Sequence, residues 1–284
     1  MKLLYTSDLH GSEPHYARLI ALAGRVKPDV VILGGDLLPD DLSTQPSKMG
    51  VGQPQWVRKE FRKSIVALRD ASGAKHVLVI FGNHDWASSV TAMKELATEG
   101  LLTVLDLKSS IAVSGLNFLG YSCTPPTPFY VKDFERLDMP GDIPPLLGGA
   151  RWDPRFSRPG THGAAHIYST YPSLADELAS LKPPPAPWVF VAHAPPFDSG
   201  LDKMYSQQCA GSKAIRTAIE THQPMLSLHG HIHDSPKVTG QYQSKIGKTI
   251  AANPGQSGAL LHHLIIDVDV STGAVRGMEY GQQA

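Results

Sequence analysis

Three short apolar runs in the first third of the chain each end in a polar loop, and a segment with helical spacing follows each loop. The loops read DLH, GGD and GNHD, and they follow apolar runs at residues 3–6, 29–33 and 76–81. Apolar residues that recur every three or four positions predict helices over residues 14–26, 57–68 and 88–98. This alternation implies parallel strands with helices packed on the sheet. The carboxyl ends of such strands share one edge, where the sites of α/β proteins assemble.

The second half of the chain predicts further strands and two helices. Residues 111–121 form a hairpin around Ser114 and Gly115, and the helices are expected over residues 171–181 and 211–221. The remaining strands are expected at residues 188–192, 225–228, 238–242, 248–251, 259–270 and 274–280. We therefore expect an α/β fold with two packed mixed β-sheets flanked by helices. No internal repeat interrupts the chain, so residues 1–284 are expected to form a single domain.

Two segments do not fit this pattern. Residues 39–55 are polar and contain several Pro and Gly residues, and residues 123–165 form a long Pro/Gly-rich excursion with weak periodicity. Loops of this length in a compact domain tend to be functional or disordered. The excursion could cover a site, could mediate contacts between copies of the chain, or could be an ordered surface segment without chemistry. It holds four arginines among acidic residues: Arg136, Arg151, Arg155 and Arg158.

The composition limits the expected partners and location. Lys and Arg total 26 and so do Asp and Glu, so the overall charge balance lacks the basic footprint of a nucleic-acid-binding protein. Two cysteines far apart form no disulfide framework, which favours a reducing compartment. The apolar run in the start MKLLYTSDLHG is too short for a signal peptide, because polar residues follow it at once. No apolar run approaches the roughly 18 residues that span a bilayer. We expect a cytoplasmic protein without a membrane or nucleic-acid partner, and homo-oligomer formation stays open.

The segment LHGHIHDS brings His229, His231 and His233 within five positions at the end of a predicted strand. A lone histidine there is ordinarily a partly buried polar residue with one satisfied hydrogen bond. Two histidines at positions i and i+2 share one face of a strand, or converge on one point just after it. Because neutral imidazole is the commonest side-chain metal ligand, this spacing suggests a metal site that needs further ligands from elsewhere.

Other strand ends supply such ligands. Oxygen or imidazole side chains stand where five predicted strands stop, and they are Asp8, His10, Asp36, Asn83, His84, His193, His231 and His233. No thiolate is included, which disfavours a structural zinc site and favours a catalytic metal that accepts oxygen and nitrogen ligands. Asp85 and Asp234 each follow one of these histidines, either to accept a hydrogen bond from an imidazole or as solvated loop carboxylates. His229 is interpreted as a strand-end residue, and Cys123 and Cys209 as buried thiols.

The ordered blocks DLH, GGD, GNHD, VAHAPP and GHIH resemble those of the calcineurin-like metallophosphoesterase family. The blocks extend from residue 8 to residue 233, and the later segment ANPG at residues 252–255 is also similar. The chain looks most like the stand-alone bacterial and archaeal phosphodiesterases and the metallophosphoesterase-domain proteins, although Ala194 replaces a glycine of the latter. The resemblance implies a four-layer sandwich and two metal ions drawn from Mn, Fe, Zn, Ni or Co.

The resemblance also implies a role for each residue. One metal would be held by Asp8, His10, Asp36 and His233. The other would be held by Asp36, Asn83, His193 and His231, so that Asp36 bridges the two. His84 would be the catalytic residue beside the metals.

These roles predict metal-dependent hydrolysis of a small phosphate ester, most of all a phosphodiester, by a hydroxide that bridges the two metals. Two dications about 3.5–4 Å apart neutralise the ester oxygens, and metal binding lowers the pKa of water steeply. A nuclease of the same family is an alternative, but its relatives usually carry an added DNA-binding region. A non-catalytic scaffold is a second alternative, but such relatives lack key histidines that are present here.

Overall fold

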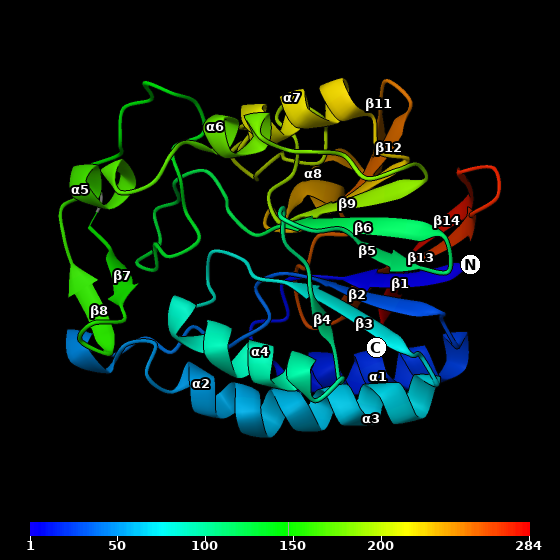
Figure 1. Cartoon of the computed structure of the whole chain (residues 1–284), viewed down its shortest axis with the longest axis horizontal. Coiled ribbons are helices and arrows are strands. Elements are labelled where there is room, and N and C mark those ends of the chain that lie inside the picture. The colour runs from blue at the N-terminus through cyan, green and yellow to red at the C-terminus, as the bar shows by residue number, and fades with distance from the viewer. Residues whose placement is uncertain (147) are drawn as a thin grey trace.

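The chain folds into two mixed β-sheets that pack face to face, with helices on both outer faces (Figure 1). The computed structural model describes residues 1–146 and 148–284, and within this part each of the two sheets has six strands. The strand orders are β14-β13-β1-β2-β3-β4 in the first sheet and β11-β12-β10-β9-β6-β5 in the second. The predicted fold class is therefore confirmed, including the four layers.

Parallel strands form the centre of the first sheet, as the alternation of strands and helices predicted. They are β1 (Lys2–Thr6), β2 (Val30–Gly34), β3 (His76–Ile80) and the short β4 (Thr103–Val104). On the far side of β1, β13 (Leu261–Asp269) runs antiparallel and pairs with β14 (Ala274–Gln283). The first sheet thus contains both the first and the last strands of the chain.

The second sheet also has a parallel centre. It consists of β6 (Leu116–Tyr121), β9 (Trp188–Ala192), β10 (Leu226–Leu228) and β12 (Thr249–Ala252). Its edges are antiparallel, with β5 (Ile111–Val113) in a hairpin with β6 and β11 (Gln243–Ile246) beside β12. The residues expected as a hairpin at 111–121 therefore pair as predicted.

Burial on both faces explains why the central strands are almost continuously apolar. In β1, Leu3 and Tyr5 point into the core between the two sheets, whereas Leu4 points toward the helices outside the first sheet. These helices are α1 (Glu13–Val26), α2 (Gln53–Trp56), the π-helix η2 (Val57–Phe61), α3 (Arg62–Ser72) and α4 (Val90–Thr98), which follows the short 3₁₀ helix η3 (Ala87–Ser89). Helices α6 (Leu174–Ala179) and α7 (Lys213–His222) cover the outer face of the second sheet.

The strand predicted at residues 238–242 is wrong. Helix α8 (Ser235–Thr239) occupies part of this range, and β11 begins only at Gln243. Pro236 stands in the first turn of this helix and Gly240, with φ 71°, ends it in the left-handed conformation. The helix predicted over residues 171–181 is shorter than expected, because Ser173 and Asp176 form a capping box that starts it at Leu174.

The excursion at residues 123–165 has secondary structure of its own. It contains the hairpin of β7 (Ala150–Asp153) and β8 (Arg158–Thr161), and α5 (Ala164–Ser169) follows it. A 3₁₀ turn, η1 (Pro46–Lys48), lies in the other irregular segment and contacts β8. In Figure 1 the excursion extends, in green, to the left of the two sheets. The two segments without a predicted pattern therefore meet in space.

A buried ion pair fixes the base of the excursion. Lys132 is 1% exposed and its Nζ lies 3.0 Å from Oε2 of Glu135, whose side chain is fully buried. The same ammonium group donates to the backbone carbonyl of Thr127 at 2.8 Å, and Tyr168 Oη donates to Glu135 at 2.6 Å. The Thr127 hydroxyl also donates to Glu135. A buried charge pair is stable only when further hydrogen bonds satisfy both ions, as they do here.

Replacement of Lys132 by methionine is expected to destabilise the protein, because the Glu135 carboxylate would stay buried without its cation. We expect the free energy of unfolding, measured with urea, to fall by about 3 kcal/mol or more. The matched control is Lys245→Met, since Lys245 is exposed on β11, and its effect should stay within about 0.5 kcal/mol. Equal stabilities of the two variants would contradict a stabilising role of the buried pair.

Candidate active site

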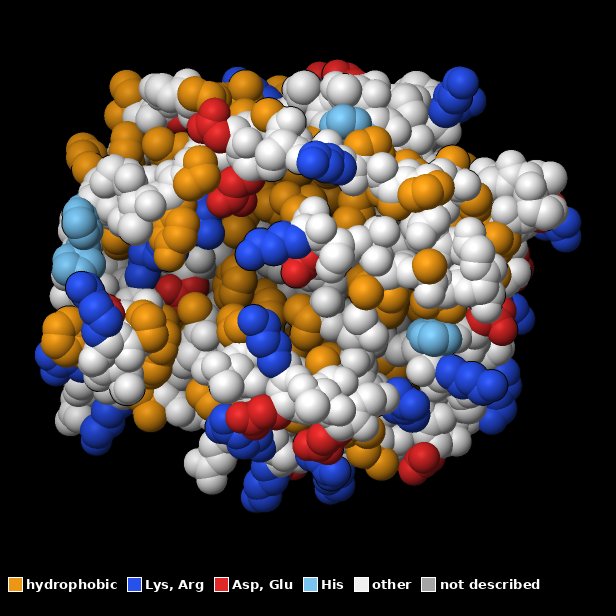
Figure 2. All heavy atoms as spheres, in the orientation of Figure 1, with side chains coloured by type: hydrophobic (Ala, Val, Ile, Leu, Met, Phe, Trp, Pro, Cys, Tyr) orange, Lys and Arg blue, Asp and Glu red, His pale blue; other side chains and the backbone are white. Residues whose placement is uncertain are grey.

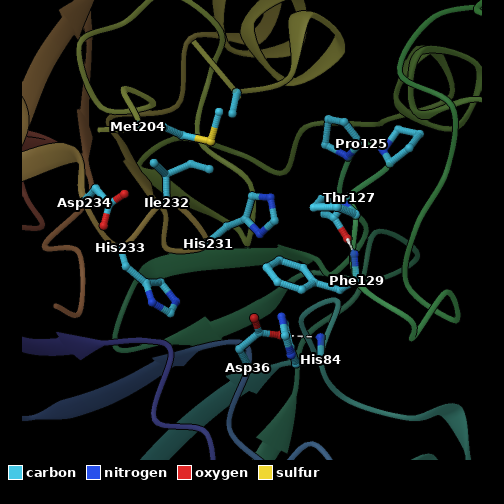
Figure 3. A pocket seen from close by; sticks show the side chains of 13 residues that line it. Asp36, His84, Pro125, Thr127, Phe129, Met204, His231, Ile232, His233 and Asp234 are labelled. Carbon is cyan, nitrogen blue, oxygen red and sulfur yellow. Dashed lines mark hydrogen bonds between the residues drawn. The ribbon is translucent and has the colours of Figure 1, made fainter. Parts of the chain in front are cut away.

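The eight side chains selected from the sequence lie together at the edge where the parallel strands of both sheets end. Asp8 and His10 follow β1, Asp36 follows β2, and the remaining five follow β3, β9 and β10: Asn83, His84, His193, His231 and His233. Figure 3 shows Asp36, His84, His231 and His233 around one pocket, contributed by segments far apart in the chain. Because the two sheets face each other, this edge collects loops from both.

A first cluster brings together Asp8, His10 and His233. Nε2 of His233 lies 3.2 Å from Oδ1 of Asp8, and it lies 3.4 Å from Nε2 of His10. One ligand atom from each of the three residues lies within 4.8 Å of the others, which is the spacing of groups that share one ion. Asp8 is fixed by Ser7 Oγ, which donates to its Oδ2 at 2.5 Å, and by the backbone N–H of His231.

A second cluster brings together Asp36, His193 and His231 within the same limit of 4.8 Å. Nδ1 of His193 lies 2.8 Å from the carbonyl oxygen of Gly34 and donates its proton to it, so Nε2 is the ring nitrogen that faces the site. That Nε2 lies 3.2 Å from Oδ2 of Asp36. The same Asp36 oxygen lies 4.0 Å from Nε2 of His10. Asp36 therefore stands between the two clusters.

Asn83 has the chemistry expected next to a cation. Its side chain is fully buried, and neither the oxygen nor the nitrogen of its amide has a hydrogen-bond partner among the described residues. Native proteins rarely leave buried polar atoms unpaired, and each such atom needs an explanation. An amide oxygen beside carboxylates and imidazoles fits a hard or borderline metal ion, so the residues present fit the metals that the sequence implied.

The backbone at this edge is held in an uncommon conformation. Asp8, His10, Asp36 and His231 have φ values of 58°, 45°, 51° and 65°, in the left-handed region that residues other than glycine seldom adopt. Each such residue costs about 1–3 kcal/mol and persists only where the surrounding structure fixes it. Hydrogen bonds between the loops do so here, from Asp8 N to Gly35 O and from His10 N to Asp36 O, both at 2.9 Å.

Glycines make room for these side chains. A Cβ atom on Gly82 would collide with Oδ1 of Asp36 and with Nε2 of His193. A Cβ atom on Gly230 would collide with the carboxylate of Asp8. The glycines of the GNHD and GHIH blocks are thus explained by the space that the clustered carboxylates and imidazoles occupy.

The cluster attracts positive charge. Burial would raise the pKa of both carboxyls, but neighbouring histidines hold that of Asp8 at about 2 and that of Asp36 well below its ordinary value. Burial would lower the pKa of the imidazoles, yet the carboxylates raise the pKa of His10 to about 9 and that of His193 to about 9. By contrast, burial and His193 lower the pKa of His231 to about 3, which keeps its ring neutral, the form that can bind a metal.

Asp40 is a site residue that the sequence analysis missed. Its Oδ1 lies 2.9 Å from Nδ1 of His84 and 3.6 Å from Nδ1 of His10. These two rings hold the pKa of Asp40 well below its ordinary value. Its position four residues after Asp36, in GGDLLPD, was the available signal, but Asp40 belongs to a segment without a predicted pattern.

Of the residues outside the predicted set, Asp85 and Cys209 differ from their interpretations, whereas His229 and Cys123 agree with theirs. Asp85 is buried and accepts hydrogen bonds from the backbone N–H groups of Leu38 and Gly82, at 3.0 and 2.9 Å, so it is neither solvated nor bonded to an imidazole in the described structure. His229 is a buried strand-end residue, as predicted, and its Nδ1 lies 2.9 Å from the carbonyl oxygen of Ala192. Cys123 is buried as expected, whereas Cys209 is partly exposed.

The site opens into a pocket of about 370 Å³. Its floor includes Asp36, His84, His231 and His233, and Asp234 lies at one side. The opposite wall comes from residues 125–129, at the start of the excursion. The excursion therefore borders the site, which is the position needed for the expected role of covering it.

Comparison with known proteins agrees with this architecture. The sequence profile of the calcineurin-like phosphoesterase family matches residues 1–235. One solved structure aligns over 100% of this chain and 99% of its own length, with a TM-score of 0.64 and 15% identity. The protein TT1561 of Thermus thermophilus aligns over 99% of this chain and 98% of its own, with a TM-score of 0.54 and 15% identity.

A candidate 5′-nucleotidase from Staphylococcus aureus, solved in complex with α-ketoglutarate, aligns over 99% of this chain but only 54% of its own, with a TM-score of 0.50 and 14% identity. No curated protein matches the sequence. Among the described residues, no helix combines the length and the apolar character needed to cross a bilayer. The profile match covers most of the chain, and we conclude that it belongs to the calcineurin-like phosphoesterase family of metal-dependent hydrolases.

Proposed function

We propose that this chain hydrolyses a small phosphodiester with the help of two metal ions. The proposed ligands of one ion are Asp8, His10, Asp36 and His233, and those of the other are Asp36, Asn83, His193 and His231. The observation that carries the proposal is the position of Asp36 between the two clusters, 3.2 Å from Nε2 of His193 and 4.0 Å from Nε2 of His10. A carboxylate has two oxygens and can serve two ions at once, which an imidazole cannot. Ions held there would supply positive charge that neutralises the phosphate oxygens and would lower the pKa of water.

The side chain proposed to assist the departing group is His84. Its Nδ1 lies 2.9 Å from Asp40, so Nδ1 donates to the carboxylate and Nε2 is left for the substrate. Burial lowers the pKa of His84, but Asp40 and Asp36 outweigh this effect and raise it, which favours the protonated ring. A positioned imidazole with a proton can donate it to a leaving oxygen. Asp40 acts through His84 in this scheme, and is a positioning residue.

The charges of the pocket favour a diester over a monoester. Its lining residues, all within the described part of the chain, include no lysine or arginine. A diester carries one negative charge on its phosphate group, whereas a monoester carries up to two. Cationic side chains therefore strengthen the binding of a monoester more than that of a diester. This supports a substrate whose only charge lies on the phosphate that meets the metals.

The same observations weigh against the two alternatives. A nuclease needs cations along a groove to follow the nucleic-acid backbone. On the face seen in Figure 2, Lys and Arg side chains are interspersed with Asp and Glu and form no continuous stripe. A non-catalytic scaffold has no need for four ligand-bearing residues in strained backbone conformations, nor for a buried asparagine with unpaired amide atoms.

An assay of the purified protein with Mn²⁺ tests the proposal. We expect hydrolysis of bis-p-nitrophenyl phosphate and of 2′,3′- or 3′,5′-cyclic AMP, and weaker hydrolysis of p-nitrophenyl phosphate. Single-stranded DNA serves as the nuclease substrate in the same assay. Hydrolysis of DNA alone would replace the phosphodiesterase with a nuclease. Failure on every substrate, with no metal found by elemental analysis, would favour a scaffold.

The glycine in GNHD gives a test of the metal ligands that does not depend on the substrate. Gly82→Ala would push a Cβ atom into Asp36 and His193, so metal affinity should fall about 10-fold to 100-fold, as for other changes that displace ligands. Gly277→Ala is the matched control, because a Cβ atom there meets nothing within 4 Å. Metal affinity is measured by titration with elemental analysis. Normal metal binding by Gly82→Ala would contradict the proposed ligand set.

The division of roles between His84 and Asp36 is tested by two substitutions. Asp36→Asn should lose bound metal together with activity, because both clusters lose the shared carboxylate. His84→Ala should keep its metal content but lower kcat by about 10²-fold to 10⁴-fold, the usual contribution of a proton donor. Metal content and turnover are measured on the same samples. If His84→Ala emptied the site, His84 would be a ligand rather than a proton donor.

A further inference from the structure

The wall of the pocket that faces the proposed metal ligands is apolar. Residues 125–129 read Pro-Pro-Thr-Pro-Phe and form one side of it, and Met204 and Ile232 close the other side. In Figure 3 these two groups face each other across His231. A pocket with a polar floor and apolar walls binds ligands that have one polar end and one apolar end. The phosphate accounts for the polar end.

Phe129 is the most exposed large side chain of this wall. Its exposed fraction is 48%, and the centre of its ring lies 4.5 Å from the centre of the His84 ring at an angle of 58° between the planes. One part of the phenyl ring thus packs against the proposed proton donor, while the rest remains open. An aromatic ring that stays exposed beside a reactive group is available to pack on a substrate.

The wall is held in place before any substrate binds. The backbone N–H of Phe129 lies 3.2 Å from the Thr127 hydroxyl oxygen, and Thr127 in turn is held by Glu135 and Lys132 through the buried pair at the base of the excursion. Three prolines in five residues fix further backbone angles. A ring that is already ordered loses little conformational entropy on binding, so its contact area contributes more fully to affinity.

The charges limit what this wall accepts. The pocket is lined by two aspartates, Asp36 and Asp234, and by no lysine or arginine. A second anionic group on the substrate would therefore meet negative charge without a cation to pair with. The volume of about 370 Å³ is at the small end of the range for ligand pockets, which fits a phosphate with one group of ring size rather than an oligomer.

We propose that Phe129, with the prolines before it and with Met204 and Ile232, forms a specificity subsite for a flat, uncharged ring attached to the phosphodiester. This inference rests on the proposed function, and it names the substrate class more closely. The ring packs on the open part of Phe129, and the phosphate lies against the histidines and Asp36. Phe129 selects the substrate by contact and takes no part in proton transfer.

Binding of two diesters with poorer leaving groups than p-nitrophenol, and therefore slower turnover, to the Mn²⁺-loaded protein tests this subsite. Diphenyl phosphate and diethyl phosphate both carry one negative charge on the phosphate oxygens and differ in their organic groups. We expect isothermal titration calorimetry to give a dissociation constant at least about tenfold lower for diphenyl phosphate, since ring burial removes more apolar area from water. Phe129→Ala should reduce this ratio to about threefold or less, and Phe129→Leu should give an intermediate ratio.

Phe156→Ala is the matched control, because Phe156 is an exposed phenylalanine of the excursion outside this pocket. It should keep the wild-type ratio, and circular dichroism checks that each variant is folded. Equal binding of the two diesters by the wild type, or an unchanged ratio in Phe129→Ala, would overturn the subsite. If the wild type hydrolyses bis-p-nitrophenyl phosphate yet shows no preference, only the subsite fails. If it prefers diphenyl phosphate but hydrolyses no ester, the proposed function fails.

Discussion

The close approach of two buried carboxylates, Asp8 and Asp36, is the constraint on which the rest of the structure depends. Each is 1% exposed, and the same imidazole, His193, lies 3.9 Å from one and 3.2 Å from the other. Two negative charges removed from water in this way are tolerated only with positive charge beside them. The carboxylates raise the pKa values of His10 and His193, in keeping with this demand for positive charge. A pocket of this kind binds cations more readily than it would bind a bare anion.

The buried strands of the first sheet hold the strained loops that carry Asp8 and Asp36 in place. The positive φ angles of Asp8 and Asp36 come immediately after strands β1 and β2, whose residues from Leu3 to Thr6 and from Val30 to Gly34 are all buried. A shift of register by one residue would move every side chain of such a strand to the opposite face and disrupt the packing of the cores on both sides of the sheet. The core therefore fixes where each strand ends, and the loops can then hold a local conformation that costs free energy. Stability and site geometry thus depend on the same apolar contacts.

Strands and site residues could be predicted from the sequence where a buried apolar run is followed directly by polar side chains. Side-chain contacts between segments far apart in the chain could not be predicted. Strands β1, β2 and β3 were predictable because they are apolar throughout, and their polar ends pointed to the site. Asp40 was missed because its importance comes from His84, 44 residues away in the sequence, and no periodicity reports such a pair. The pair of Lys132 and Glu135 was missed for a related reason, since charged residues are ordinarily assigned to the surface. The strand expected at residues 238–242 is in part a helix, because Pro236 and Gly240 favour the start and the end of a short helix, and this outweighs the β propensity of Val238 and Tyr242.

The two sides of the pocket come from different parts of the chain. The strands of the two sheets hold one side in place, and a separate buried ion pair holds the other. The histidines and carboxylates stand on loops between the strands and helices of the two sheets, where a change of backbone would disturb both clusters. The apolar wall belongs to the excursion, whose base is held by its own buried pair. Residues 125–129 can therefore differ in sequence without disturbing the clustered carboxylates and imidazoles, provided that Thr127 keeps its bonds to Lys132 and Glu135. Under the proposed function, the loops at the ends of the sheets supply the residues for the reaction, and the excursion selects the organic group held beside them.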